Sequence, residues 1–276
     1  MELLFSPLFS GSDGNCTYVG TREEAVIVDA GMSMRAILEE MDRAQLDPGA
    51  VRALLVTHEH TDHINGVGAL ARKLNVPIYA TPGTWRGMEK RAGKLQPGQR
   101  REIECGADFY IGNINVTPFS TLHDTNEPCG YAFDLGGLRA SIATDIGCVR
   151  ENWLSTVLGS DIVLLEADYD PDMLMAGFYT YELKRRIRGT HGHLSNEDAG
   201  KAACRLVASG TKHIILGHMS KNNNFPELAL RTVEDILAQE GYLCGRDVNL
   251  YVARREGLTG VFRIASAPDE EQCNAG

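Results

Sequence analysis

The sequence predicts a single α/β domain whose buried strands end in residues able to bind metal. Short apolar runs typical of strands alternate with segments of helical periodicity, as in α/β proteins. The 276 residues suit one large domain, and no composition break or internal repeat marks a linker. Because strand ends at one edge of a sheet share a face, we expect the chemistry there. The ligand-type residues that follow apolar runs are Asp29, His58, His123, Asp145, Glu166 and His218.

Composition and charge describe an ordinary globular protein with an acidic balance. Hydrophobic residues make up 43% of the chain and charged residues 23%. The net charge of −10 argues against general coating of nucleic acid but leaves room for a local basic groove. We expect the domain to span residues 1–264 and the acidic, polar residues 265–276 to form a disordered tail.

The cytoplasm is the location that the sequence predicts. No apolar run approaches the ~20 residues that a membrane span needs, and the N-terminus lacks the basic region and cleavage site of a signal peptide. The seven cysteines are odd in number, scattered and without a CxxC pair. This distribution favours reduced thiols over a disulfide framework or a zinc ribbon. We therefore expect no membrane partner, and the sequence leaves the oligomeric state open.

In the first half of the chain, apolar runs predict strands that are interrupted by three helices. Residues at helical spacing predict helices over 34–41, 67–74 and 84–91. Asp47-Pro48-Gly49 ends the region of the first helix, and the residues 93–101 read as a polar loop. The strands are expected at 3–9, 17–20, 25–28, 51–57, 76–79, 109–111 and 114–119.

The second half of the chain continues the alternation. Strands 131–135 and 138–144 form a predicted hairpin across Gly136-Gly137. Ser195 with Asp198 fits a capping box that opens a helix. The other expected elements are helices over 178–188 and 227–239 and strands at 162–165, 213–217, 248–253 and 258–264.

The six residues 58–63, His-Glu-His-Thr-Asp-His, carry the strongest functional signal. Alternate residues of an extended segment point the same way, so we expect His58, His60 and Asp62 to converge and His63 to open the next helix. Imidazole and carboxylate together favour zinc, manganese or iron over calcium. One alternative is an exposed polar loop. Another is a structural zinc, but cysteines usually close such sites and none lies nearby.

Two further candidates are ambiguous when the residues are taken alone. The turn at residues 10–15 can hold an anion with its amides and hydroxyls, or it can be a plain hairpin turn. His123 follows the strand 114–119, and a single histidine in such a place is more often structural than a ligand. Neither position identifies a function by itself.

The spacing of the ligand-type residues resembles that of the metallo-β-lactamase fold superfamily. The resemblance covers about residues 3–264 and implies a four-layer αββα sandwich with a dinuclear metal site along one edge. The residues that carry it are Asp29, His58, His60, Asp62, His63, His123, Asp145 and His218.

This resemblance implies a role for each of those residues. Asp145 would bridge the two ions, and Asp29 would orient the histidine loop. An aspartate at the bridging position, where many antibiotic-degrading members have cysteine, disfavours β-lactam hydrolysis. The implied ligands are His58, His60 and His123 for the first ion, and Asp62, His63 and His218 for the second.

Local motifs resemble the bacterial YycJ (WalJ) family of DNA exonucleases. These motifs cover residues 10–16, 166–168, 192–196 and 216–221. The departures are small: Asp13 stands where serine is common and Met219 where leucine is common. The resemblance implies a phosphodiesterase that degrades DNA from the 5′ end through a hydroxide bridging two divalent ions. Zinc or manganese is expected, and iron is also compatible with these ligands.

The catalytic residues implied by the resemblance are Asp62, His193 and Glu166. Asp62 would orient the hydroxide while binding a metal. By similarity to ribonuclease Z, His193 would donate a proton to the leaving oxygen and Glu166 would hold His193. His193 also lies in a Gly-flanked loop before a helix start, where backbone amides favour an anion. The alternative is that His193 caps the helix or packs locally.

A basic run at residues 184–188 immediately precedes this loop. A charge run on a helix is usually a solvated face, but in an otherwise acidic protein beside a phosphate-handling histidine it favours contacts with a phosphate backbone. DNA is the expected partner, and the sequence does not separate DNA from RNA. The predicted substrate contacts are Ser12, Asn15, Lys184, Arg185, Arg188, Ser195, Lys221 and Asn223.

Two other functions stay open at this stage. The same two-metal site can serve a small-molecule hydrolase acting on a lactone, a thioester or a cyclic nucleotide. A non-catalytic protein that kept the fold is the third hypothesis, and it is disfavoured because no ligand residue is missing.

Overall fold

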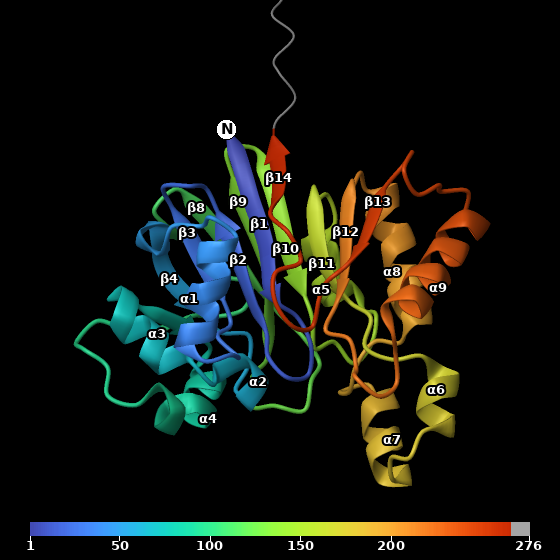
Figure 1. The fold of residues 1–276 in the computed structure, drawn as a ribbon, viewed down its shortest axis with the longest axis horizontal. Coiled ribbons are helices and arrows are strands. Elements are labelled where there is room, and N and C mark those ends of the chain that lie inside the picture. The colour runs from blue at the N-terminus through green and yellow to red at the C-terminus, as the bar shows by residue number, and fades with distance from the viewer. Residues whose placement is uncertain (266–276) are drawn as a thin grey trace, which may run out of the picture.

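Two seven-stranded mixed sheets pack face to face in the computed structural model, which describes residues 1–265. Helices cover the outer face of each sheet, so the layers run helix, sheet, sheet, helix (Figure 1). The predicted αββα sandwich is therefore confirmed. The strand orders are β14-β1-β2-β3-β4-β5-β6 and β13-β12-β11-β10-β9-β8-β7.

The first sheet comes from the N-terminal part of the chain and the last strand. Its strands β1 to β3 are antiparallel, β4 to β6 then add parallel to β3, and β14 pairs antiparallel with β1. The strand bounds are β1 Glu2–Phe9, β2 Cys16–Gly20, β3 Ala25–Val28, β4 Val51–Leu55, β5 Ile78–Ala80, β6 Arg100–Glu102 and β14 Phe262–Ala265. The helices of this half are α1 Met34–Arg43, α2 Thr61–Ile64, α3 Val67–Leu74 and α4 Pro82–Ala92, with a 3-10 turn at Pro48–Ala50.

The second sheet also combines antiparallel and parallel strands. Strands β7 to β10 are antiparallel neighbours, and β11 to β13 add parallel to β10. The strand bounds are β7 Phe109–Ile111, β8 Ile114–Ser120, β9 Cys129–Leu135, β10 Leu138–Ala143, β11 Ile162–Glu166, β12 His213–Gly217 and β13 Asn249–Val252. The helices are α5 Glu151–Val157, α6 Pro171–Ala176, α7 Tyr181–Arg188, α8 Asn196–Ala208 and α9 Pro226–Gln239.

Three apolar layers hold the four structural layers together. One lies between the first sheet and its helices and contains Trp85 and Ile27. The middle layer between the two sheets contains Phe133 and Ile215. The third joins the second sheet to α5, α8 and α9 around Trp153. Burial of apolar area at roughly 25 cal/mol per Å² makes these layers the main stabilising term, and they fix the two sheets as a rigid frame.

The carboxyl ends of the parallel strands meet at one edge of this frame, the lower edge in Figure 1. At this edge three residues that follow β3, β10 and β12 adopt left-handed backbone: Asp29 with φ 61°, Asp145 with φ 55° and His218 with φ 52°. Side chains other than glycine are uncommon there, and such strain concentrates at functional sites. The chain therefore turns sharply as it leaves each strand and keeps these three side chains at the edge.

Several short elements differ from the prediction. The expected polar loop 93–101 ends in strand β6, whose three residues are all exposed and so carry no apolar alternation. Helices α5 and α6 were not predicted, because seven and six residues are too few for a periodic signal. Helix α7 begins at Tyr181, not at residue 178, since Thr180 caps its N-terminus. The last strand is shorter than the predicted 258–264 and begins at Phe262.

The ends of the predicted domain can be compared only in part. Ala265, placed in the tail by the sequence, belongs to β14. The rest of the predicted tail, residues 266–276, lies outside the described residues. Across residues 1–265, none of the helices combines the length and the apolar character needed to cross a membrane.

Candidate metal centre

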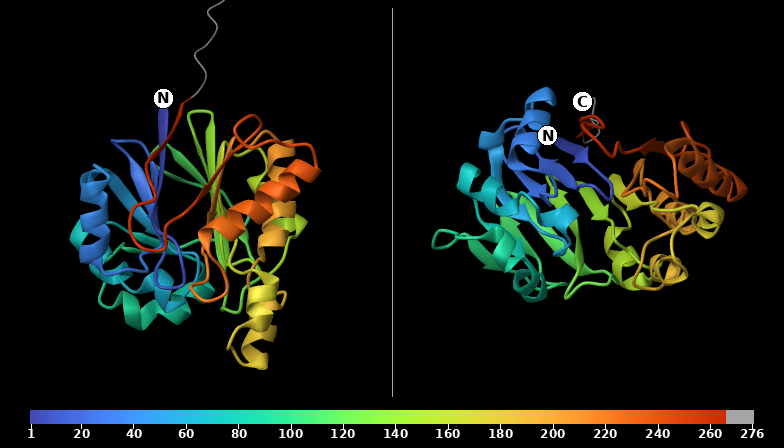
Figure 2. Two further views of the ribbon diagram at one scale, coloured as in Figure 1. Left: turned by 45° about the vertical axis from the view of Figure 1, so that its right-hand side comes forward. Right: turned by 60° about the horizontal axis from the view of Figure 1, so that its bottom comes forward.

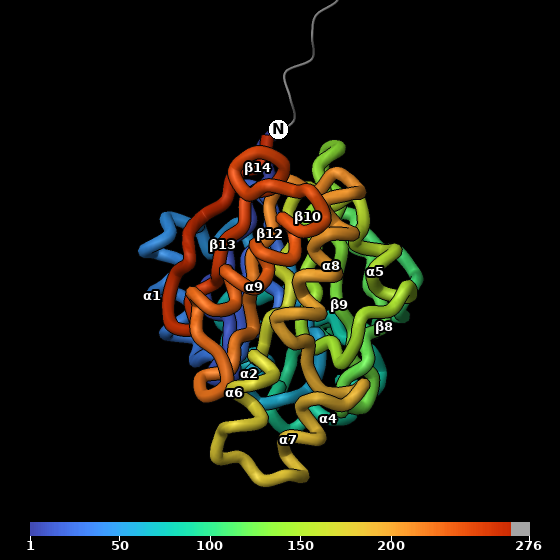
Figure 3. Tube along the Cα trace, turned by 90° about the vertical axis from the view of Figure 1, so that its right-hand side faces the viewer, coloured from blue at the N-terminus to red at the C-terminus, as the bar shows by residue number. Residues whose placement is uncertain are grey.

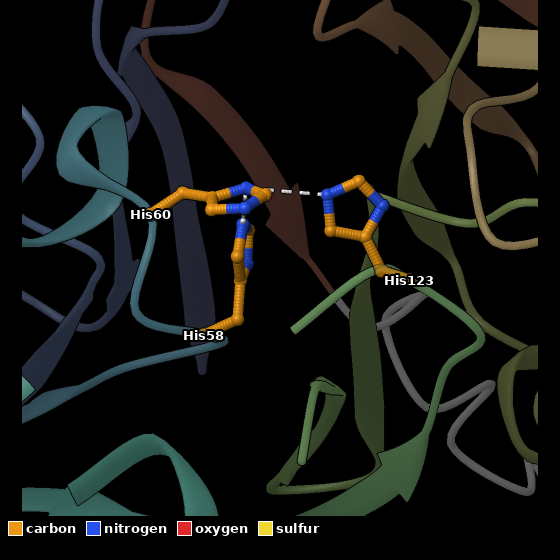
Figure 4. A group of neighbouring side chains, drawn as sticks. All are labelled: His58, His60 and His123. Carbon is orange, nitrogen blue, oxygen red and sulfur yellow. Dashed lines mark hydrogen bonds between the residues drawn. The ribbon is translucent and has the colours of Figure 1, made fainter. Parts of the chain in front are cut away.

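His58, His60 and His123 bring three imidazole rings together where β4 and β8 end (Figure 4). His60 Nδ1 lies 3.1 Å from His58 Nε2 and 3.3 Å from His123 Nε2. His123 Nδ1 donates to the Gly192 carbonyl at 3.0 Å, which leaves Nε2 with a lone pair. Burial and the neighbouring imidazoles hold the pKa of His58 well below its usual value. Neutral imidazoles converging in this way are suited to bind a cation.

Asp62, His63 and His218 form a second group beside the first. His63 Nε2 lies 3.5 Å from Asp62 Oδ2, and His218 Nε2 lies 3.8 Å from the same oxygen. Burial opposes charge on His63, but Asp29 and Asp145 outweigh it and raise the pKa of His63 well above its usual value. Burial opposes charge on His218 as well, and Asp145 again outweighs it, so the pKa of His218 is also raised. The carboxylates thus create a buried region that attracts positive charge.

Asp145 lies between the two groups. Its Oδ1 is 3.5 Å from His123 Nε2 and 3.4 Å from His218 Nε2, and its Oδ2 is 3.3 Å from His63 Nε2. Asp145 Oδ2 and both ring nitrogens of His218 are buried without a hydrogen-bond partner among the described residues. Buried polar atoms are rarely left in this state, because an unmade hydrogen bond costs ~1–3 kcal/mol. The orphaned atoms and the N/O donor set therefore fit divalent metal ions.

The predicted convergence of His58, His60 and Asp62 on one side is wrong. The segment stops being extended after His60, which caps α2, so Asp62 lies inside a helix and Thr61, not His63, opens it. Asp62 therefore groups with His63 and His218, whereas His58 and His60 group with His123. The grouping implied by the family resemblance, Asp62 with His63 and His218, matches the positions in the structure.

Asp29 ties the histidine stretch to the first sheet. Its Oδ1 accepts from the Thr57 amide at 2.9 Å, and its Oδ2 accepts from the Thr57 hydroxyl at 2.9 Å and from His63 Nδ1 at 2.8 Å. The bond to Nδ1 leaves Nε2 of His63 facing Asp145 and Asp62. Asp29 therefore occupies the position from which a carboxylate orients a metal-binding histidine.

Replacing Asp29 by alanine is expected to weaken metal binding by about 10- to 100-fold, because His63 loses the partner that orients its ring. Asparagine keeps an oxygen for the Thr57 amide and tolerates the left-handed backbone, so Asp29→Asn should lose less. Titration of each purified variant with zinc against a chelator measures the change. Equal affinity of wild type and Asp29→Ala would show that Asp29 has no orienting role.

The turn at residues 10–15 packs against this centre. The Asn15 amide donates to the Asp62 carbonyl at 2.8 Å, and the Gly31 amide donates to the Asn15 carbonyl at 2.8 Å. A Cβ on Gly31 would lie 1.6 Å from the Asp62 carbonyl oxygen, so only glycine permits this approach. Ser10 Oγ accepts from the His218 amide at 2.9 Å. The turn thus supports the centre.

His193 and Glu166 form a pair beside the centre. His193 Nδ1 lies 2.7 Å from Glu166 Oε1, and Glu166 is fully buried. Glu166 Oε2 also accepts from the Ile146 and Leu194 amides. Burial opposes charge on His193, but Asp168 and Glu166 outweigh it and raise the pKa of His193 to about 9. Since Nδ1 is engaged, the proton on Nε2 is the one available for transfer.

Asp124 is a charged residue at the centre that the sequence did not single out. Its Oδ1 lies 3.5 Å from His123 Nε2 and 3.8 Å from His60 Nε2, and its other oxygen pairs with Arg186. Burial opposes its charge, but the bond from Arg186 holds the pKa of Asp124 below its usual value. Its position directly after His123 was the feature of the sequence that could have identified Asp124 as a site residue.

Asp168 was also missed as a site residue. It is buried, and its Oδ2 lies 3.8 Å from His218 Nδ1. Burial raises the pKa of Asp168 to about 6. The available signal was its place in the motif at residues 166–168, which carries part of the family resemblance.

Three predicted substrate contacts have side chains that are engaged inside the protein. Ser195 is buried and its hydroxyl accepts from the Asp198 amide, which confirms its predicted cap of α8. Asn223 is buried and bonds to Ser220. Asn15 is buried as well, and its side-chain amide lies 3.0 Å from His63 Nε2.

The basic residues at 184–188 differ in what they contact: some bond within the protein, and others have no ion-pair partner among the described residues. Lys184 donates to the Met175 and Gly177 carbonyls and so ties α7 to α6. Arg185 and Arg188 are exposed, and neither has a carboxylate within 4.0 Å among residues 1–265. The other two predicted contacts, Ser12 and Lys221, are exposed.

The fold and the histidine–aspartate cluster define a metallo-β-lactamase-fold hydrolase. The family described as "Beta-lactamase superfamily domain" matches residues 24–219. The chain is also 39% identical over 251 residues to exodeoxyribonuclease YycJ of Bacillus anthracis, covering 91% of this chain and 95% of the relative. Exodeoxyribonuclease WalJ of Streptococcus pneumoniae is 39% identical over 262 residues, covering 94% of this chain and 97% of the relative. The chain therefore belongs to the beta-lactamase superfamily and, within it, to the YycJ/WalJ family.

Solved structures agree on the fold. The metallo-β-lactamase fold protein YhfI from Bacillus subtilis superposes with a TM-score of 0.71 over 95% of this chain and 100% of that one. The two sequences are only 14% identical, so the likeness concerns the fold alone.

Proposed function

We propose that this protein is a metal-dependent DNA exonuclease that degrades from the 5′ end. The observation that carries the proposal is the His193–Glu166 pair beside Asp145: a protonated imidazole held next to a cluster of metal-type ligands. Phosphodiester cleavage needs such a proton donor for the leaving oxygen. The names of the YycJ and WalJ relatives support DNA as the substrate and an exonuclease as the activity.

We propose two divalent ions, zinc or manganese, with iron also compatible. When bound, the ions would supply a water of lowered pKa and neutralise charge on the phosphate. The proposed ligands are His58, His60 and His123 for one ion and Asp62, His63 and His218 for the other, with Asp145 shared.

The chain's own groups would divide the remaining work. Asp62, which is 24% exposed, faces both the cluster and solvent and would orient the attacking water. His193 would hold a proton on Nε2 and deliver it to the departing oxygen. Glu166 would fix the ring and stabilise its charge, as a buried carboxylate does for an imidazolium.

Replacing Arg185 and Arg188 together by alanine tests the DNA proposal. The double variant should lose most of its activity on DNA. The slope of log activity against log salt should fall by about 1.4, because each cation that neutralises a phosphate of a single strand contributes ~0.7 to that slope. Lys221→Ala provides a single-charge comparison at the loop after His218. A small p-nitrophenyl phosphodiester should be hydrolysed at an unchanged rate. Equal losses on DNA and on the small ester would favour a small-molecule hydrolase instead.

Polarity, substrate and metal have a direct test. Elemental analysis of the purified protein gives the number and identity of its ions. Digestion of DNA labelled at either end, with RNA in parallel, should release the 5′ label first. Release of the 3′ label first would contradict the proposed direction.

A cytoplasmic location also belongs to the proposal, and it is supported by the six described cysteines, all of which are free thiols.

A further inference from the structure

The segment formed by α6 and α7 projects from the body at the end of the molecule that carries the metal centre (Figure 3). In Figure 2 the same yellow segment extends beyond the ends of the strands. Helix α7 has no buried residue. A helix of a globular protein normally buries one face, so α7 presents surface that its own fold does not use.

Large apolar side chains are exposed on this segment. Among residues 1–265 there are seven such side chains, and three of them lie here: Met175 at 47% exposed, Phe178 at 81% and Tyr181 at 70%. Phe178 and Tyr179 rings meet edge to face at 5.1 Å, and Tyr179 accepts a bond from Asn222. Lys184 further fixes the loop through two carbonyls. The aromatic side chains are therefore held out to solvent on a supported loop.

Cations accompany these aromatic rings. Arg185 and Arg188 belong to the same helix, are exposed, and lack a carboxylate within 4.0 Å in the described part of the chain. Although the protein as a whole carries a net charge of −10, α7 places these two exposed cations beside the aromatic rings. Exposed aromatic rings beside arginines without an ion-pair partner match the two parts of a single-stranded nucleic acid, its bases and its phosphates.

The carboxyl end of α7 is attached to the metal centre. Arg186 pairs with Asp124, whose Oδ1 lies 3.5 Å from His123 Nε2. Seven helical steps at ~1.5 Å each place Tyr181 about 10.5 Å along the helix from Arg188 at that end. At ~3.4 Å per stacked nucleotide, this length corresponds to roughly three bases.

We propose that Phe178 and Tyr181 form a platform on which unpaired bases of a DNA end stack, while Arg185 and Arg188 contact the phosphates between the platform and the metal centre. This proposal rests on the nuclease function proposed above. It names α7 as the element that positions the strand and accounts for the absence of buried residues in that helix.

The test uses the metal-loaded protein and a short single-stranded phosphorothioate DNA, which resists cleavage, with 2-aminopurine placed at successive positions. Wild-type protein should quench the probe most strongly roughly three nucleotides from the end that enters the site. The double variant Phe178→Ala, Tyr181→Ala should abolish this quenching and bind the DNA about 5- to 100-fold more weakly, as expected when base stacking is removed. On cleavable DNA, KM should rise and kcat should not.

Tyr110→Ala is the matched control, because Tyr110 is an equally exposed aromatic residue, at 68%, on the edge strand β7. Unchanged quenching and affinity in the Phe178/Tyr181 variant would overturn the platform while leaving the nuclease proposal intact. Hydrolysis of a p-nitrophenyl phosphodiester, with no binding or cleavage of DNA by wild-type protein, would overturn both. Equal losses in the Tyr110 variant would show that the effect is not specific to the platform and would also overturn it.

Discussion

Replacing Asp145 by asparagine is expected to reduce DNA hydrolysis by at least about 10³-fold and to lower the metal content of the purified protein. Asp145 faces ring nitrogens from both metal-type groups, at 3.3–3.5 Å. Loss of its charge should forfeit several kcal/mol of charge stabilisation at the reacting phosphate, and ~1.4 kcal/mol corresponds to tenfold in rate.

Asparagine is the informative substitution because it removes the negative charge of Asp145 without adding backbone strain. Asp145 has φ 55°, a conformation that asparagine tolerates and alanine does not. Circular dichroism should therefore show a folded protein, while elemental analysis shows fewer ions per chain. A variant that keeps two ions and turns over within about tenfold of wild type would refute the shared-ligand role of Asp145.

Replacing His193 by alanine should leave the metal content unchanged and lower turnover of DNA by about 10²- to 10⁴-fold, the usual contribution of a general acid. The reason is its hydrogen bond to buried Glu166, which holds a protonated ring beside the cluster. The loss should be far smaller on a p-nitrophenyl phosphodiester, since p-nitrophenolate leaves without a proton. Parallel assays of both substrates with the same enzyme preparation give the comparison.

His191 supplies the matched control, because it lies two residues away and is exposed. His191→Ala should hydrolyse both substrates like wild type. Loss of metal from His193→Ala would instead make His193 a ligand, and equal losses on both esters would remove its role as proton donor. Glu166→Gln should show the same dependence on the leaving group with a smaller loss, because glutamine can still bond to the ring but cannot stabilise its charge.

The sequence predicted the position of the histidine–aspartate cluster, because the ends of the apolar runs mark the ends of strands. Apolar runs ending at His58, His123, Asp145 and His218 predicted one shared edge, and the parallel pairing of β3 with β4 and of β10, β11 and β12 produces that edge. Short or exposed elements were not predicted, because they lack such apolar runs. Strand β6 is exposed throughout, and helix α6 spans only six residues, so neither has an apolar pattern to detect.

The sequence did not predict which polar side chains bond inside the protein and which are exposed to solvent. Lys184 and Arg185 are adjacent and both basic, yet one ties α7 to backbone carbonyls and the other faces solvent. Asn223 and Lys221 differ in the same way, since Asn223 is buried against Ser220 while Lys221 is exposed. Which of two neighbouring polar residues reaches solvent depends on the turn of the backbone and on what packs against it, and residue type records neither.

The sequence by itself located the set of metal-type residues, because they follow apolar runs along strands, and the resemblance of their pattern to a known family implied the class of protein. The family resemblance implied how those residues divide, and the tertiary structure shows the physical cause of that division. Helix α2 begins after His60 and carries Asp62 toward His218, and left-handed backbone at Asp29, Asp145 and His218 turns the chain sharply at strand ends of both sheets. Asp62 and His218 lie far apart in the sequence and in different sheets' loops, so packing of the two sheets, and not local preference, brings them together.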